Sequence, residues 1–410
     1  MHVLSKGLKT ALVLCCLLAI PCAQGQSTRN LLLELGYSQS AIDQRIEAVY
    51  TQLFEGADKI YFEVGDSMAY VSDLKNKDVR SEGLSYGLMV AVQLDKQAVF
   101  DKIWRWTQTY VRHHDGPRKG YFAWSFNPAT MKRNAQGSAS DGELYIITSL
   151  LYAGNRWGNE GPINYYEEAR QILNAMWEKD GTDGVYNLFN TEHKQITFVP
   201  DRGGYLWTDP SYHLPAFLDF WAEQANDGHE AFYRACADTS RAFLKRACHP
   251  VTGLNADYTE FSGAPRSTNW MPAAFRYDSW RVPMNIAMDY LWTGKDKAWQ
   301  QDYARRIQHF FRQEGINTFV DQYNLDGSAP EWILPAGGFR VRRHSIGLKA
   351  TLATTSLMLP AKEGADFVHA LWNAKLEPYE DGYFDPYYDG LLYLFSLLHL
   401  SGKYTPILPQ

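Results

Sequence analysis

Cysteine is scarce in this sequence, and neither sign of charge dominates. Three of the five cysteines lie in the first 25 residues, so the rest of the chain contains only Cys236 and Cys248, which excludes a disulfide scaffold. These two are 12 residues apart in one helical pattern, about 18 Å along a helix, so we expect two buried free thiols. With 40 Lys and Arg against 46 Asp and Glu, the chain lacks a basic stripe, and we expect no nucleic-acid partner.

Apolar runs long enough to cross a membrane are missing as well. One run of ten residues, 11–20, is too short, since a spanning helix needs about 20. It follows two lysines, ends at Pro21 and precedes the residues AQG at 23–25, which is typical of a signal peptide cleaved after Gly25. We therefore expect residues 1–25 to be removed and residues 26–410 to be secreted or periplasmic, without a membrane anchor. Pro21 argues against lipid attachment at Cys22.

Motifs for metal, nucleotide or serine chemistry are absent or incomplete. His113 and His114 are adjacent, but no H-E-x-x-H and no glycine-rich phosphate loop occurs, so we expect no metal and no cofactor. Residues 83–87 match G-x-S-x-G, yet the nucleophile elbow follows an apolar strand, and the residues before it, 78–82, read DVRSE. We expect these glycines to serve close helix packing rather than a Ser85 nucleophile.

Helical periodicity recurs along the chain, and its character alternates. Residues 83–94, 144–155 and 391–401 are apolar nearly all round, which is typical of helices buried on every side. Residues 167–179 and 296–312 are amphipathic and carry their charges on one face. Twelve segments have helical spacing: 40–54, 82–95, 97–113, 141–154, 163–178, 212–225, 229–246, 280–293, 296–313, 344–359, 363–374 and 388–401.

Twelve helices that alternate between buried and amphipathic predict six helical hairpins. Six hairpins can close into a ring with an inner and an outer layer, so we expect an all-α fold, an (α/α)6 barrel formed as one domain by residues 26–410. Apolar and polar residues alternate over 186–199, which predicts a small β-hairpin within the helical fold. An irregular all-α fold or an open helical array remains the alternative.

Acidic and aromatic residues gather where the buried helices begin. Glu82, Asp141, Asp209, Asp278 and Asp389 lie at or just before such starts, and in a ring these starts share one rim. Some of these acids could simply cap helices. However, the chain also has 13 Trp, 26 Tyr and 20 Phe, and a mouth lined by carboxylates and aromatic rings is typical of a carbohydrate cleft.

Three sequence blocks, taken in order, resemble glycoside hydrolase family 8. They are SEGLSYGLM at 81–89, ASDGE at 139–143 and YDSWRVP at 277–283, and the stretches at 209–212 and 383–388 fit less specifically. The resemblance runs from about residue 60 to the C-terminus. It implies an (α/α)6 barrel and an inverting hydrolase of β-1,4-linked glycans such as xylan, cellulose or chitosan.

The resemblance also implies roles for individual residues. Glu82 matches the general acid, and neighbours such as Tyr86 could desolvate it and raise its pKa. Asp278 matches the general base of the xylanase and cellulase branches, which argues against chitosan as substrate. Asp141 matches the carboxylate that binds and distorts the central sugar. Arg281 lies one helical turn after Asp278 and would steady the base or the sugar.

Aromatic residues are the candidates for binding the sugar itself. Tyr212 matches a tyrosine near the attacking water, and Trp124, Trp207 and Tyr383 are candidates for stacking on sugar rings, with a plain core role as the alternative for each. A non-catalytic glycan-binding protein would also keep such aromatics, but it would need neither the acid nor the base.

One loop bears on specificity within the family. Residues 324–343 lead to His344 just before a buried helix, and Leu334-Pro335 and His344 partly resemble the blocking loop of reducing-end xylose-releasing exo-oligoxylanases. We therefore expect xylose release from the reducing end of xylo-oligosaccharides, by a monomer. An endo-acting xylanase or endoglucanase is the alternative.

Overall fold

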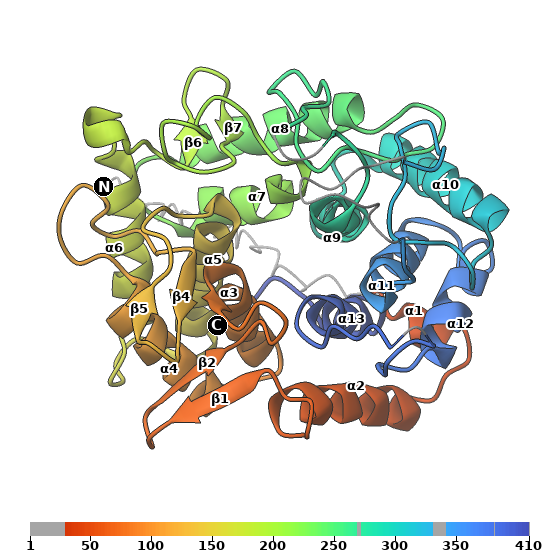
Figure 1. Ribbon diagram of the computed structural model, residues 1–410, viewed down its shortest axis with the longest axis horizontal. Helices are drawn as coiled ribbons and strands as arrows, with labels where there is room; N and C mark the ends of the chain where they lie inside the picture. The colour runs from red at the N-terminus through yellow and green to blue at the C-terminus, as the bar shows by residue number, and fades with distance from the viewer. Residues whose placement is uncertain (1–28, 269–271, 331–341, 381, 410) are drawn as a thin grey trace, which may run out of the picture.

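The chain forms a closed double ring of helices (Figure 1). The computed structural model describes residues 29–268, 272–330, 342–380 and 382–409. The predicted signal peptide, residues 1–25, and the Leu334-Pro335 pair lie outside these ranges. The ring has the (α/α)6 architecture that the sequence predicts, and the prediction of an all-α barrel is confirmed.

The inner layer and the outer layer each contain six of the described helices. The inner helices are α3 (Ser81–Gln93), α5 (Ser140–Trp157), α7 (Pro215–Gln224), α9 (Arg281–Trp292), α11 (Ile346–Thr354) and α13 (Tyr388–Leu400). The outer helices are α2 (Gln39–Phe54), α4 (Gln97–Trp106), α6 (Tyr165–Trp177), α8 (Glu230–Ala247), α10 (Lys297–Glu314) and α12 (Ala365–Asn373). The first outer helix, α2, packs against the last inner helix, α13, and closes the ring.

Burial explains why the layers alternate. Every residue of α13 is buried, and so are residues 140–155 of α5, because inner helices meet neighbours on all sides. In α8 and α10 only one face is buried and the other carries the charges. Cys236 in α8 and Cys248 just after it are buried free thiols, as the sequence predicts.

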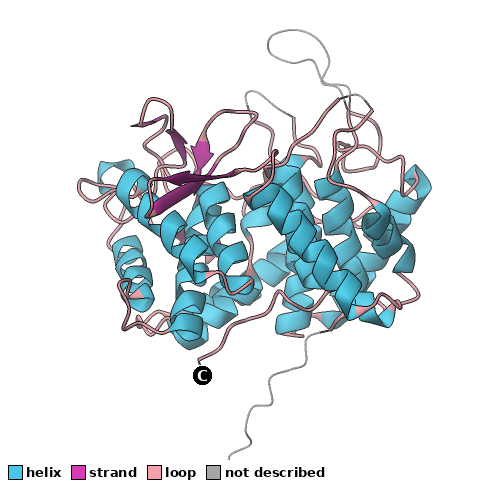
Figure 2. Ribbon diagram, turned by 90° about the horizontal axis from the view of Figure 1, so that it is seen from below, coloured by secondary structure: helices cyan, strands magenta, loops and turns pink. Residues whose placement is uncertain are grey.

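Short strands lie at one end of the barrel (Figure 2). The hairpin expected within 186–199 is confirmed as β6 (Phe189–Asn190) and β7 (Gln195–Ile196). Sequence periodicity missed the remaining small elements: α1 (Leu31–Glu34), the hairpin of β1 (Tyr61–Val64) and β2 (Met68–Val71), and the sheet of β3 (Val79–Arg80), β4 (Ser125–Asn127) and β5 (Lys132–Arg133). Because β3 runs directly into α3, this end is the one where the inner helices begin.

No serine-hydrolase elbow forms around Ser85. Residues 81–93 form one continuous helix, and the Ser85 hydroxyl donates to the backbone carbonyl of Glu82 at 2.7 Å. Gly87 lies against Val71 and Ile103, so it serves close packing as expected. Among the helices of the described ranges, none has both the length and the apolarity that a bilayer crossing requires.

Candidate active site

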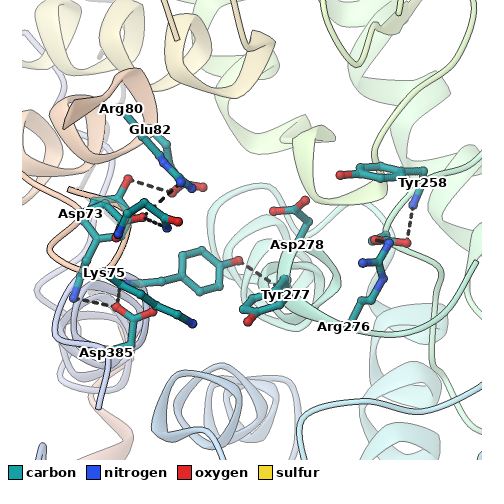
Figure 3. Close-up of a pocket in the computed structure, with 13 residues that line it drawn as sticks. Asp73, Lys75, Arg80, Glu82, Tyr258, Arg276, Tyr277, Asp278 and Asp385 are labelled. Atoms are coloured by element: carbon teal, nitrogen blue, oxygen red, sulfur yellow. Dashed lines mark hydrogen bonds and ion pairs between the residues drawn. The ribbon is translucent and has the colours of Figure 1, made fainter. Parts of the chain in front are cut away.

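A cavity of about 370 Å³ opens at the rim where the inner helices begin. Glu82 and Asp278 both line it, whereas Asp141, Tyr212 and Arg281 do not reach its lining and are buried. Figure 3 shows Asp73, Lys75, Arg80 and Asp385 on the Glu82 side and Tyr258 and Arg276 on the Asp278 side. The further lining residues are Asn76, Asp257, Tyr277, Tyr387 and Tyr388.

Glu82, Asp141 and Asp278 lie at or just before the starts of inner helices, but none of them caps its helix. Glu82 is the second residue of α3 and Asp141 the second of α5, and the residues before these helices make no side-chain cap. Asp278 lies in a 3-10 turn (Tyr277–Trp280) that leads into α9. Asp209 does act as an N-cap, but of the short 3-10 turn Pro210–Tyr212 that precedes α7: its carboxylate accepts from the Ser211 amide at 2.7 Å.

The guanidinium of Arg281 joins all three acids. Its Nη1 donates to Glu82 Oε2 at 3.1 Å and to Asp141 Oδ2 at 2.8 Å, and its Nη2 donates to Asp278 Oδ1 at 2.8 Å. Both nitrogens belong to one planar group, so the contacting oxygens of Glu82 and Asp278 lie within about 8 Å of each other. Arg281 therefore fixes the mutual geometry of the three carboxylates.

Backbone strain occurs next to Asp278. Tyr277 has φ of 33°, in the left-handed region that a bulky side chain rarely adopts. Its carbonyl accepts from the Tyr388 hydroxyl at 2.9 Å, and its ring stacks on Trp280 with centroids 5.1 Å apart. These contacts hold the strained residue in place. Such strain persists where surrounding structure enforces it, and it often occurs at functional sites.

Burial shifts the pKa values of Glu82 and Asp278 in the same direction. Burial, with the charges of Asp141 and Asp278, raises the pKa of Glu82 to about 7 against the attraction of Arg281. Burial also raises the pKa of Asp278, with Asp141 adding to the effect and Arg281 and Arg276 opposing it. A carboxyl group with a pKa near 7 can hold a proton at neutral pH and donate it.

The aromatic candidates lie in different surroundings. Tyr212 is buried, with the Arg281 guanidinium 5.4 Å from its ring centroid. Trp124 is 39% exposed on the rim beside Arg80. Trp207 is buried and stacks on Phe198 at 4.1 Å. Neither tryptophan lines the cavity.

Two further candidates from the C-terminal third also lie outside the cavity lining. The ring of Tyr383 has the Lys75 ammonium 5.0 Å and the Arg343 guanidinium 4.7 Å from its centroid. His344 is exposed, and its Nδ1 is 2.8 Å from the Phe319 carbonyl. Two cationic side chains therefore lie where a sugar ring would stack on Tyr383.

Sequence reasoning missed several charged residues of the cavity, chiefly Asp73, Lys75, Arg80, Asp257 and Arg276. Arg276 forms an ion pair with Asp257, and Arg80 pairs with Asp78 at 3.1 Å and with Asp73 at 3.4 Å. None lies within an α-helix of the described ranges, so helical periodicity could not mark them. Within those ranges, no group of three or more His, Cys, Asp or Glu side chains could hold a metal ion.

The sequence profile of the family described as Glycosyl hydrolases family 8 matches residues 69–333. The chain belongs to this family. The match includes Glu82, Asp141, Asp278 and Arg281. Family 8 members are glycoside hydrolases, so the protein is an enzyme of this class, and the barrel agrees with the fold of family 8 structures.

Several family 8 proteins resemble this chain over most of their length. The reducing-end xylose-releasing exo-oligoxylanase Rex8A of Paenibacillus barcinonensis is 37% identical over 92% of this chain and 95% of its own. The reducing end xylose-releasing exo-oligoxylanase of Halalkalibacterium halodurans is 38% identical over 93% of this chain and 95% of its own. A xylanase from Teredinibacter turnerae, solved as a catalytic mutant with xylohexaose, has a TM-score of 0.84 at 37% identity and covers 93% of this chain and 98% of its own.

Proposed function

We propose that this protein is an inverting glycoside hydrolase that cleaves β-1,4-xylosidic bonds and releases xylose from the reducing end of xylo-oligosaccharides. The names of the two exo-oligoxylanase relatives support the substrate and the exo action. The observation that carries the chemistry is the Arg281 fork, which groups three carboxylates at a cavity where Glu82 has a pKa of about 7.

In the proposed reaction, protonated Glu82 gives its proton to the glycosidic oxygen. The bond from the anomeric carbon to that oxygen breaks, and its electron pair stays on the oxygen of the departing xylose. Asp278 takes a proton from water, whose oxygen bonds to the anomeric carbon from the opposite face. The acid and base of inverting glycosidases stand roughly 6.5–9.5 Å apart to leave room for this water, and the limit set by Arg281 is compatible with that spacing.

The remaining residues support these two. From the family resemblance we propose that Asp141 binds the sugar at the cleavage point; Arg281 holds one of its oxygens at 2.8 Å and the Gly142 amide donates to the other at 2.9 Å. Tyr212 is buried with the Arg281 guanidinium 5.4 Å from its ring centroid, and from the family resemblance we propose that it lies near the attacking water. We further propose that residues 26–410 act as one monomeric domain after export, because the features of residues 1–25 are those of a cleaved leader.

The assignment of the acid is tested by Glu82→Gln, with Glu143→Gln as its control. Glu143 is fully buried, and burial raises its pKa to about 8, but it does not line the cavity and accepts from the Phe122 amide at 3.1 Å. We expect Glu82→Gln to lower kcat on xylotriose by about 10²–10⁴-fold and Glu143→Gln to change it little. A Glu82→Gln enzyme as fast as wild type would rule out the acid assignment and favour a glycan-binding role.

Stereochemistry tests the pairing of acid and base. Inversion of a β-linked substrate yields the α-anomer first, which proton NMR of early product detects. If the β-anomer appears first, Asp278 is not the base.

An endo-acting xylanase is the second candidate, because the Teredinibacter turnerae protein, whose name is simply xylanase and mentions no reducing-end release, is as similar in fold as the exo-oligoxylanase. The exo enzyme should release one xylose from the reducing end of xylotriose and cut polymeric xylan slowly. Rapid loss of xylan viscosity with little free xylose would establish the endo-acting alternative.

A further inference from the structure

The side chain of Tyr387 contacts the candidate acid directly. Its hydroxyl donates to Glu82 Oε1 at 3.0 Å, while Arg281 donates to Oε2 at 3.1 Å. Tyr387 is 2% exposed and immediately precedes α13. The carboxylate of Asp385 fixes this turn by accepting from the amides of Tyr387 and Tyr388 at 3.1 and 3.0 Å. The hydroxyl is thus held against one oxygen of Glu82.

The residue after Glu82 makes this contact possible. A Cβ atom at Gly83 would lie 2.8 Å from the Tyr387 hydroxyl oxygen and closer still to its ring, so any larger residue would displace the tyrosine. Gly83 has ordinary helical geometry within α3, so its conformational freedom is not what the site requires. The missing side chain is therefore explained by the approach of the Tyr387 ring to the helix.

We propose that Tyr387 is a positioning residue for the general acid, with a hydroxyl that stabilises the carboxylate that forms as Glu82 loses its proton. The proposal rests on the proposed function, in which Glu82 is the acid. A hydroxyl can accept from a protonated carboxyl and donate to an ionised one, so rotation of one O–H bond serves both states. Burial and the neighbouring Glu82 raise the pKa of Tyr387 well above its ordinary value, so it keeps its proton throughout.

The effect of this contact grows during the reaction. As the proton passes from Glu82 to the glycosidic oxygen, negative charge develops on a carboxylate that is buried away from bulk water. A buried carboxylate without donors is costly, and hydrogen bonds to charged groups are stronger than those to neutral ones. Tyr387 therefore stabilises the transition state more than the ground state, which lowers the barrier to protonation of the leaving group.

The test compares two substrates in Tyr387→Phe, which keeps the ring and removes only the hydroxyl. Xylotriose needs a proton on its leaving group, whereas β-xylobiosyl fluoride does not. We expect kcat on xylotriose to fall about 10–100-fold with KM unchanged, and kcat on the fluoride to stay within about twofold of wild type. Removing a donor to the ionised form raises the pKa of Glu82 further, so the alkaline limb of the kcat profile should move to higher pH.

The matched control is Tyr393→Phe in α13. The Tyr393 hydroxyl donates to the Ala374 carbonyl and accepts from Arg45, each at 3.2 Å and away from the cavity. This variant should match wild type on both substrates. If Tyr387→Phe does not fold, Gly83→Ala displaces the same hydroxyl from the other side and should give the same preference for the fluoride.

Two outcomes would overturn the proposal: an equal loss on both substrates, or an alkaline limb that does not move. Glu82→Gln separates this failure from that of the proposed function. If Glu82→Gln slows xylotriose much more than the fluoride but Tyr387→Phe does not, only the role of Tyr387 is wrong. If Glu82→Gln slows both equally, Glu82 is not the acid, and the proposed function fails with it.

Discussion

Two buried arginines each gather three carboxylates, yet the two clusters differ in how completely their charges are paired. Arg281 binds Glu82, Asp141 and Asp278 at the mouth of the barrel. Arg241 in α8 binds Asp219, Asp238 and Asp289 away from the cavity. Helix α9 belongs to both clusters, because it begins with Arg281 and carries Asp289 two turns later.

Hydrogen bonds saturate the Arg241 cluster. Its Nε, Nη1 and Nη2 all donate to carboxylates, and Asp289 also accepts from Thr293 at 3.0 Å and from Gln300 at 2.8 Å. Lys295 supplies a second cation to Asp219 at 2.8 Å. Every described carboxylate of this cluster therefore has a donor.

In the Arg281 cluster, one nitrogen of the guanidinium serves several acceptors. Its Nη1 is shared among Glu82, Asp141 and the Tyr86 hydroxyl, whereas its Nε has no partner within the described residues. Burial raises the pKa values of Glu82 and Asp278, the charge of Asp141 adds to the effect, and the one guanidinium that the three acids share opposes it only in part. The comparison suggests different roles for the two clusters. The carboxylates around Arg241 are fully hydrogen-bonded and stabilise the barrel, whereas an acid beside Arg281 whose pKa is raised can hold a proton and give it to a substrate.

The largest expected effect is a loss of stability when the Arg241 cluster is disrupted. Arg241→Met would leave buried carboxylates without their main partner, and we expect the free energy of unfolding to fall by about 3–5 kcal/mol. Urea denaturation measures this loss. Below the unfolding transition kcat should stay within about twofold of wild type, because the Arg281 cluster is intact. A large loss of kcat in folded protein would mean that the clusters are coupled through α9.

For Arg281→Met we expect the opposite: a large loss of kcat and a smaller loss of stability than in Arg241→Met. Without the guanidinium the pKa values of Glu82 and Asp278 rise further, which disfavours the charged form of Asp278 that the proposed base requires. We expect kcat on xylotriose to fall by about 10²–10³-fold, or about 3–4 kcal/mol, with a smaller loss of stability than in Arg241→Met because these acids can take up protons. Steady-state kinetics and urea denaturation on the same sample check this. A stability loss as large as that of Arg241→Met would contradict the distinction.

The raised pKa of Glu82 should also lower the stability of the folded protein in a way that depends on pH. The folded-state pKa of Glu82, about 7, lies above its ordinary 4.5, so its unfavourable effect is absent below about pH 4.5, grows as the pH rises and is complete above pH 7. Glu82→Gln removes this titration, and we expect it to be more stable than wild type by about 1–2 kcal/mol at pH 8 but equal at pH 4. Thermal melts at both pH values measure this. The same gain at pH 4 would exclude the titration of Glu82 as its cause.

The smallest expected effect concerns two tryptophans, one on the rim and one in the core. Trp124 is half exposed on the rim, whereas Trp207 is packed against Phe198. Trp124→Ala should raise KM for longer xylo-oligosaccharides about fivefold, equivalent to about 1 kcal/mol of stacking, with kcat and stability nearly unchanged. Trp207→Ala should instead lower the melting temperature. An unchanged KM in Trp124→Ala would remove this residue from the binding surface.

The barrel could be predicted because its helices differ in charge pattern along the sequence. The residues of 391–401 and of 296–312 reveal an inner and an outer helix without any tertiary information. The short strands β1 and β2 could not be found in this way, since four residues are too few to establish a period. Their pairing depends on tertiary contacts, for example the packing of β2 against α4.

The site was predictable only where chemistry-bearing residues begin helices. Glu82, Asp141 and Asp278 stand in recognisable blocks, but Asp257 and Arg276 come from loops and meet only in the folded chain. Composition also could not separate an exposed ring from a core ring, so Trp124 and Trp207 carried equal weight before the structure was known. The link between Tyr387 and Glu82 has no local signal except the glycine at position 83.

Ring closure has a consequence for the order of folding. Glu82 receives its hydrogen bonds from Arg281 and Tyr387, which follow it by 199 and 305 residues. Contacts of such separation form late, because the entropy of closing long loops must be overcome first. During synthesis the first inner helix must therefore wait for the last hairpin before its acid is correctly held. The proposed catalytic acid is therefore correctly held only once the whole barrel is complete, and we expect a partly folded intermediate to lack activity.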